Sequence, residues 1–170
     1  MIGADVPGVP PIDARPWGRA IAWLVFLAPF FFVTYGAANA IAVKRSYVPS
    51  IVFAWERHIP FLGWMIVPYW SIDLFYAASL FVCSTRAELA ALVRRLVTAQ
   101  IAAIVCFILF PLRFTFARPE TYGTARTLFS VLTTFDKPFN QAPSLHIALL
   151  VIIWPLYARH VQGAARWLLG

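Results

Sequence analysis

The stretch that decides the fold is AIAWLVFLAPFFFVTYGAANAIAV, residues 20–43. It contains no charged residue, and about 20 apolar residues are enough for a helix to cross the hydrocarbon core of a bilayer. Arg19 precedes the stretch and Lys44 and Arg45 follow it, so charges bracket the apolar run at both ends. We therefore predict that residues 20–43 form a membrane-spanning helix.

The whole chain shares this apolar character. Of its 170 residues, 61% are hydrophobic and 12% are charged, and the mean hydropathy is +0.75. Soluble domains lie nearer to half apolar and a quarter charged, so the composition predicts an integral membrane protein. The net charge is +7, and the basic residues lie in short gaps between apolar runs. This position favours lipid head groups over nucleic acid as partners. Cys83 and Cys106 lie in apolar runs and predict neither a disulfide nor a metal site, and we expect no cofactor.

Further apolar runs predict additional spans at residues 59–85, 96–112 and 143–158, and residues 164–170 read as the opening of a fifth. We expect an all-α, polytopic transmembrane helical bundle with four spans plus the start of a fifth, a fragment of a six-helix domain. Residues 1–17 are predicted to be a flexible N-terminal leader, and residues 18–170 a transmembrane domain that is incomplete at its C-terminal end. Residues 47–64 combine aromatic and charged side chains, which predicts a helix lying at the membrane interface.

Lysine and arginine counts do not decide the orientation, because seven fall on each side of the predicted membrane. The shorter inner loops favour an N-terminus inside the cell. We therefore expect a multi-pass protein of the bacterial inner (plasma) membrane with its site facing outward. The sequence does not indicate an oligomeric state.

Polar chemistry is concentrated in residues 113–142, between the third and fourth predicted spans. Arg113 and Arg118 open this segment, and Arg118 precedes Pro119, which favours extended backbone. The planar guanidinium fork of arginine suits phosphate oxygens. The alternative is a pair of interfacial arginines that anchor a helix end.

The fourth predicted span opens with Pro-Ser-Leu-His, residues 143–146. Proline suits the first position of a helix, so we expect Pro143 there, with the free N–H groups of Ser144, Leu145 and His146 facing the loop. Ser144 adds a hydroxyl donor, and the proton of His146 can move near neutral pH. The alternative is a capped helix with an ordinary interfacial histidine. The two arginines favour a phosphate pocket.

RFTFARP at residues 113–119 and PSLH together resemble the first two motifs of the type 2 phosphatidic acid phosphatase superfamily, in the branch similar to inositol phosphorylceramide synthases. The resemblance covers residues 110–153. It implies that Arg118 and Ser144 bind phosphate oxygens and that His146 protonates the leaving alkoxide. Arg113 takes the place of the first basic residue, with a shorter spacing than the common lysine form. Leu145 stands where many members have glycine.

The function that the resemblance implies is that of a lipid phosphatase or phosphotransferase acting on a phosphorylated lipid through a phosphohistidine intermediate. The third motif of the family, which supplies the nucleophilic histidine, is absent from the sequence. His160 is about 21 Å from His146 along a helix, and His58 matches no family position. We therefore expect this chain to carry the phosphate site and the acid, with the nucleophile lying outside it.

Two other functions remain open from the sequence. The same fold without a nucleophile could be a non-catalytic membrane anchor or a lipid-phosphate-binding module. A small transporter subunit is a more remote alternative that rests on Asp73, which lies in the middle of the second predicted span. An ionisable residue at that depth is either functional or a structural partner of an Arg or Tyr on a neighbouring helix.

Overall fold

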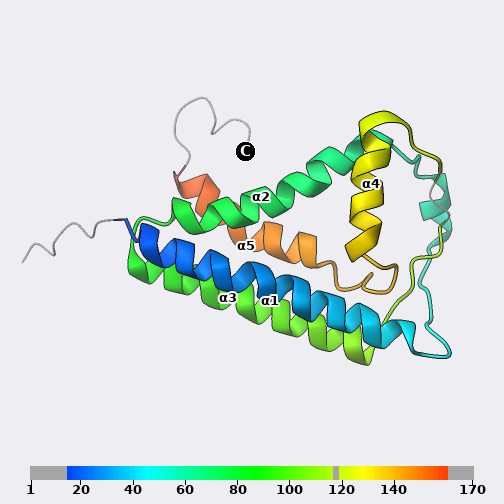
Figure 1. Ribbon diagram of the computed structural model, residues 1–170, viewed down its shortest axis with the longest axis horizontal. Helices are drawn as coiled ribbons and strands as arrows, with labels where there is room; N and C mark the ends of the chain where they lie inside the picture. Colours follow the sequence, from blue (N-terminus) through cyan, green and yellow to red (C-terminus); the bar gives the residue numbers. More distant parts are fainter. Residues whose placement is uncertain (1–14, 117–118, 161–170) are drawn as a thin grey trace, which may run out of the picture.

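A computed structural model describes residues 15–116 and 119–160 of the chain (Figure 1). Within these residues there are five α-helices and two short 3₁₀ helices and no β-strand, which confirms the all-α prediction for this part of the chain. The elements are α1 (Trp17–Val43), η1 (Ala54–His58), η2 (Gly63–Met65), α2 (Ile66–Val82), α3 (Arg86–Leu109), α4 (Gly123–Phe135) and α5 (Leu145–His160).

Three of these helical segments are long and apolar enough to cross a membrane. They are α1, the continuous Gly63–Val82 segment made by η2 and α2, and α3. This agrees with a multi-pass membrane protein. The apolar helix α5 has 16 residues and is shorter than the other three. The fourth span and the six-helix domain therefore stay predictions, and the predicted fifth span lies outside the described residues.

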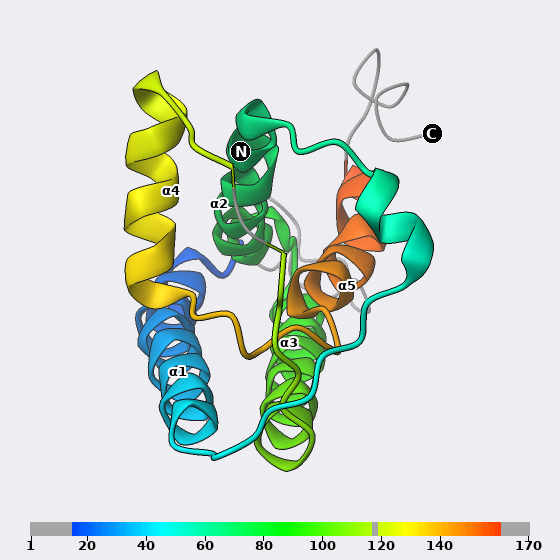
Figure 2. The ribbon, with the colours of Figure 1, turned by 90° about the vertical axis from the view of Figure 1, so that its right-hand side faces the viewer.

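The long helices alternate in direction along the bundle (Figure 1). α1 and α3 run one way, and α2 and α5 run back the other way, so α1 and α3 finish where α2 and α5 begin. α4 and the segments that connect α1 to α2 and α3 to α5 gather at this loop-rich end, which faces the viewer in Figure 2. The start of α1 and the end of α5 lie at the opposite end of the bundle.

α3 packs against both α1 and α5 and carries the largest share of the buried side chains. Small side chains at Ala38, Ala42 and Ala103 are almost completely buried, which lets neighbouring helix backbones approach closely, as is usual in membranes. Gln100 adds a polar contact, because its Nε2 donates a hydrogen bond of 2.8 Å to Thr34 Oγ1. α1 and α3 therefore form a closely packed pair that extends to the loop-rich end.

The predicted boundaries of the third span are wrong. Residues 96–112 were expected, but α3 begins ten residues earlier, at Arg86, and ends at Leu109. The early start has a local cause, because the side chain of Thr85 accepts a hydrogen bond from the Glu88 N–H, and Glu88 accepts one from the Ser84 N–H. This reciprocal capping is readable as Thr-x-x-Glu in the sequence. Arg94 therefore lies inside the helix and does not mark its beginning.

The region before α2 also differs from the prediction. The second span was expected at residues 59–85, whereas the helical segment runs over Gly63–Val82. In place of the interfacial helix predicted at residues 47–64, the structure has the five-residue helix η1 and the start of η2. Pro49 and Pro60 flank η1, and proline cannot donate the backbone hydrogen bond that a continuing helix needs.

α4 was not predicted, since residues 113–142 were interpreted as a loop. Its half-buried positions are Ala125, Leu128, Phe129 and Leu132, at the spacing of one helical face, and its other described side chains are exposed. This helix stands across the loop-rich end of the bundle (Figures 1 and 2). Its apolar stripe faces inward and helps to build the cavity described below.

Candidate functional site

A cavity of about 1070 Å³ lies at the loop-rich end of the bundle. Its apolar lining, called the apolar wall below, comes from the segment before α2, the segment after α3, and α4. This wall includes Phe61, Leu62, Met65, Phe114, Phe129 and Leu132. The polar lining includes Arg113, Asp136, Lys137, Asn140, Ser144 and His146. A cavity with both kinds of lining fits a molecule that has both a charged and an apolar part.

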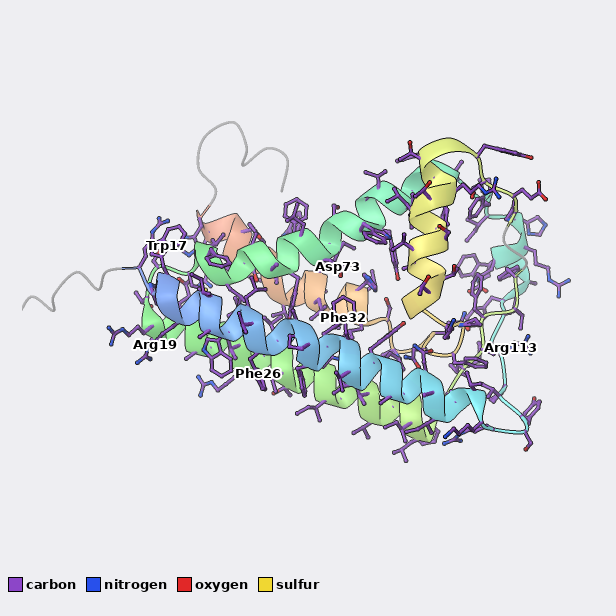
Figure 3. All side chains as sticks on the ribbon, in the orientation of Figure 1. Trp17, Arg19, Phe26, Phe32, Asp73 and Arg113 are labelled. Carbon is purple, nitrogen blue, oxygen red and sulfur yellow. The ribbon has the colours of Figure 1, made fainter. Side chains whose placement is uncertain are left out.

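Three of the four predicted site residues line this one cavity. They are Arg113, Ser144 and His146, which come from two segments about 30 residues apart in the sequence. The fourth, Arg118, lies outside the described residues. Figure 3 labels Arg113 at the loop-rich end of the ribbon. The structure thus brings the described members of the predicted set to a common surface.

Backbone pairing holds Arg113 at the cavity. Its own N–H donates to the carbonyl of Pro49 at 2.8 Å, and the N–H of Phe114 donates to the carbonyl of Pro138 at 2.8 Å. These bonds connect the segment after α3 to the segment after α1 and to the segment before α5. The side chain of Arg113 is exposed, so its guanidinium is free to approach a ligand at the mouth of the cavity.

The start of α5 differs from the prediction in one respect. Pro143 does not occupy the first helical position, because α5 begins at Leu145. Ser144 takes the capping position, where its Oγ accepts a hydrogen bond of 3.4 Å from the Ile147 N–H and its carbonyl accepts the Ala148 N–H at 3.1 Å. A hydroxyl side chain at this position satisfies helix N–H groups better than proline would. The hydroxyl of Ser144 can still donate its own proton.

His146 lies between α2 and the segment that precedes α5. Its ring contacts the ring of Tyr69 on α2, with centroids 4.3 Å apart and planes inclined by 31°. Burial lowers the pKa of His146, whereas the carboxylates of Asp73 and Asp136 act to raise it. Asp73 therefore has a histidine as its electrostatic neighbour, whereas the sequence interpretation considered an Arg or a Tyr.

Asp136 connects the cavity to α1. Its Oδ1 accepts a hydrogen bond of 2.6 Å from the hydroxyl of Tyr35, and Asn140 Nδ2 donates to the Tyr35 carbonyl at 3.3 Å. Asn140 Oδ1 and Gln141 Oε1 are buried and have no hydrogen-bond partner among the described residues. These contacts fix the segment before α5 to the closely packed pair of α1 and α3.

Several cavity residues were missed from the sequence. Tyr69 and Asp136 carry no motif, and they join the site only because α2 and the segment before α5 meet there. Phe129 and Leu132 had a detectable signal, namely the helical spacing of the apolar residues of α4. That spacing is masked in the sequence because the intervening residues are mainly Ser, Thr and Val, which are weak helix formers.

The two other histidines lie away from the cavity. His58 is exposed on η1 and does not line it. His160 lies at the opposite end of the bundle, where its Nε2 is 3.0 Å from Glu88 Oε1. Within residues 15–116 and 119–160, no group of three or more His, Cys, Asp and Glu side chains is placed to hold a metal ion.

Comparisons of the chain with protein-family models, with curated proteins and with solved structures gave no match.

Proposed function

We propose that this chain forms the phosphate-binding part of a membrane-embedded lipid phosphatase or phosphotransferase whose substrate is a phosphorylated lipid. The observation that carries the proposal is that Arg113, Ser144 and His146 line one cavity together with a set of apolar side chains. The resemblance of RFTFARP and PSLH to the type 2 phosphatidic acid phosphatase superfamily motivates the choice of reaction. We place the protein in a bacterial inner membrane, with the cavity facing outward.

The polar side of the cavity is suited to a phosphate group. Arg113 and Lys137 supply positive charge, and the N–H groups of Leu145 and His146 begin α5, where the helix dipole favours an anion. Charge-assisted hydrogen bonds from such donors are about twice as strong as neutral ones. The apolar wall offers a contact surface for the lipid chain next to its head group.

The proposed reaction follows the family pattern. A histidine attacks phosphorus, the bond from phosphorus to the ester oxygen breaks, and His146 transfers a proton to the departing oxygen. Arg113 and the helix N–H groups stabilise the charge on the phosphoryl oxygens during this step. Neither His58 nor His160 lines the cavity, so the proposal assigns binding and proton donation to this chain, and not the attack on phosphorus.

A non-catalytic lipid-phosphate-binding module is the second candidate. It is favoured by one observation, namely that His146 is the sole histidine among the described residues that line the cavity. Such a module would bind the same ligand with the same side chains. Release or transfer of phosphate from the lipid distinguishes the two functions, because only the enzyme forms a phosphohistidine.

Binding of dioctanoyl phosphatidic acid to the full chain in detergent, measured by isothermal titration calorimetry, tests the proposal. Arg113→Gln should weaken binding by about tenfold, which corresponds to about 1.4 kcal/mol, because it removes a charged donor. Arg126→Gln is a matched control, since Arg126 is an exposed arginine on α4 that does not line the cavity.

Two results would contradict the proposal. One is the absence of binding by the wild-type chain together with no protection against thermal unfolding by phosphate or vanadate. The other is equal weakening of binding by Arg113→Gln and Arg126→Gln, which would indicate general attraction of a basic surface for an anion.

A further inference from the structure

A groove lies between α3 and α5, at the end of the bundle away from the cavity. α3 begins at this end and α5 finishes there, and the two helices pack against each other (Figure 1). The groove has a volume of about 370 Å³, within the range of about 300–1,000 Å³ that is usual for small-molecule sites. The residues that line it are Thr85, Glu88, Ala91, Leu92 and Arg95 from the start of α3, and Ile152, Leu156 and Arg159 from α5.

The groove carries more positive than negative charge. It contains two arginines and one carboxylate, and the carboxylate already has partners. Glu88 Oε2 accepts the Ser84 N–H at 2.9 Å. Oε1 of the same carboxylate is 3.0 Å from His160 Nε2 and 3.5 Å from Arg159 Nη2. Arg95 forms no ion pair with the acidic side chains of the described residues, so the groove offers an uncompensated positive charge to an anion.

Arg95 lies where the charged part of α3 ends. All charged residues of α3 fall within residues 86–95, and the 14 residues 96–109 carry none. These uncharged residues rise about 21 Å, so they occupy most of a hydrocarbon core of about 30 Å. Side chains on a helix tilt toward its N-terminus, and a long arginine side chain can extend in that direction to the head groups. The guanidinium of Arg95 is therefore placed to reach lipid phosphates in the leaflet opposite the cavity.

The other lining residues suit the rest of a phospholipid head group. Thr85 Oγ1 accepts the Glu88 N–H at 3.1 Å and can still donate its own proton to a phosphate oxygen. The side chain of Arg159 is 62% exposed, so part of its guanidinium remains available beside Glu88. Leu92 and Ile152 offer apolar surface to the glycerol and the first methylene groups of the acyl chains.

We propose that this groove binds the head group of an anionic phospholipid from the leaflet opposite the cavity, with the phosphodiester held between Arg95 and Arg159. Arginine binds phosphate oxygens through a planar fork of N–H donors, and basic pockets between membrane helices suit anionic head groups. The bound lipid joins the start of α3 to the end of α5. The site is independent of the proposed function, because no residue lines both the groove and the cavity.

The test is isothermal titration calorimetry of dioctanoyl phosphatidylglycerol with the full chain in an uncharged detergent. Arg95→Gln should weaken binding about fivefold, since it removes one basic group close to the lipid phosphate. Arg94→Gln is the matched control and should leave binding unchanged. Arg94 precedes Arg95 on the same helix and is also exposed, but it does not line the groove.

Two further ligands define what the groove recognises. Dioctanoyl phosphatidylcholine should bind more weakly than dioctanoyl phosphatidylglycerol, because it has the same phosphodiester and chains but no net charge. Inorganic phosphate at the concentration of the lipid should not displace it, since a free anion lacks the apolar contacts. Equal affinity for the two lipids, or displacement by inorganic phosphate, would overturn the proposal.

The variants also locate the bound lipid. Equal weakening by Arg94→Gln and Arg95→Gln would indicate general attraction to a basic surface and would overturn the proposal. Arg113→Gln changes the cavity at the other end of the bundle and should leave this binding unchanged. Weakening by Arg113→Gln without weakening by Arg95→Gln would place the lipid in the cavity, and the groove would then have no ligand.

Discussion

The hydroxyl of Tyr35 provides the most direct test of how the cavity is held together. Tyr35→Phe removes one oxygen atom and nothing else. The ring keeps its stacked contact with Phe31, at 5.6 Å between centroids, and its edge contact with Phe107, at 6.0 Å. The change therefore isolates the hydrogen bond of 2.6 Å from Tyr35 to Asp136.

The expected loss follows from the kind of bond. A hydrogen bond to a charged group contributes about 1.5–3 kcal/mol, and the carboxylate of Asp136 would lose a donor at a half-buried site. We expect Tyr35→Phe to lower the free energy of unfolding by about 2 kcal/mol. The segment between α4 and α5 should also become more mobile, because Asp136 anchors it to α1.

The assay is equilibrium unfolding in mixed micelles, combined with a double-mutant cycle of Tyr35→Phe and Asp136→Asn. The two changes should be strongly non-additive, with a coupling energy of about 1–2 kcal/mol, because each removes the same bond. Tyr47→Phe is the control, since Tyr47 is 78% exposed. A loss for Tyr35→Phe no greater than that for Tyr47→Phe, or additive single changes, would refute the reasoning.

Three further outcomes are expected. Ser144→Ala should lower the free energy of unfolding by about 1 kcal/mol, since it removes the cap of α5, and Ser144→Asp should restore the cap while weakening phosphate binding. Glu88→Gln should lower the melting temperature more than the control Glu56→Gln does. The reason is that Glu88 connects the start of α3 to Arg159 and His160 at the end of α5. Equal effects of the two changes would contradict that role. Phe129→Ala should weaken binding of dioctanoyl phosphatidic acid but not of inorganic phosphate, because Phe129 belongs to the apolar wall. Val131→Ala, on the exposed face of α4, is the control. Equal losses of affinity for both ligands would argue against an apolar wall.

The parts of the fold that could be predicted are those that the bilayer imposes. Apolar stretches of sufficient length, with at most one charged residue each, predicted the positions of α1, α2 and α3 because a membrane tolerates few other structures. The boundaries were less predictable where side-chain hydrogen bonds decided them. Thr85 and Glu88 extended α3 past Arg94 and Arg95, and Ser144 displaced Pro143 from the start of α5.

The candidate site was predictable only as far as residues carried a motif. Arg113, Ser144 and His146 were chosen from local patterns, and the structure places them on one cavity. Tyr69 joins His146 through the packing of α2 against α5, and no spacing along the chain indicates which turn of α2 will face α5. The apolar wall supplied by α4 did have a periodic signal, which was hidden among weak helix-forming residues.

The alternating direction of the helices has a practical consequence for topology. With α1, α2 and α3 crossing the bilayer, the residues around Trp17 and the turn at Ser84 share one aqueous compartment, and Arg113 and Lys137 share the other. One impermeant label, placed at a single engineered cysteine at Trp17, would therefore assign the compartment of every loop at once. Whether the label reacts with that cysteine then decides the orientation, which the count of seven basic residues on each side does not decide.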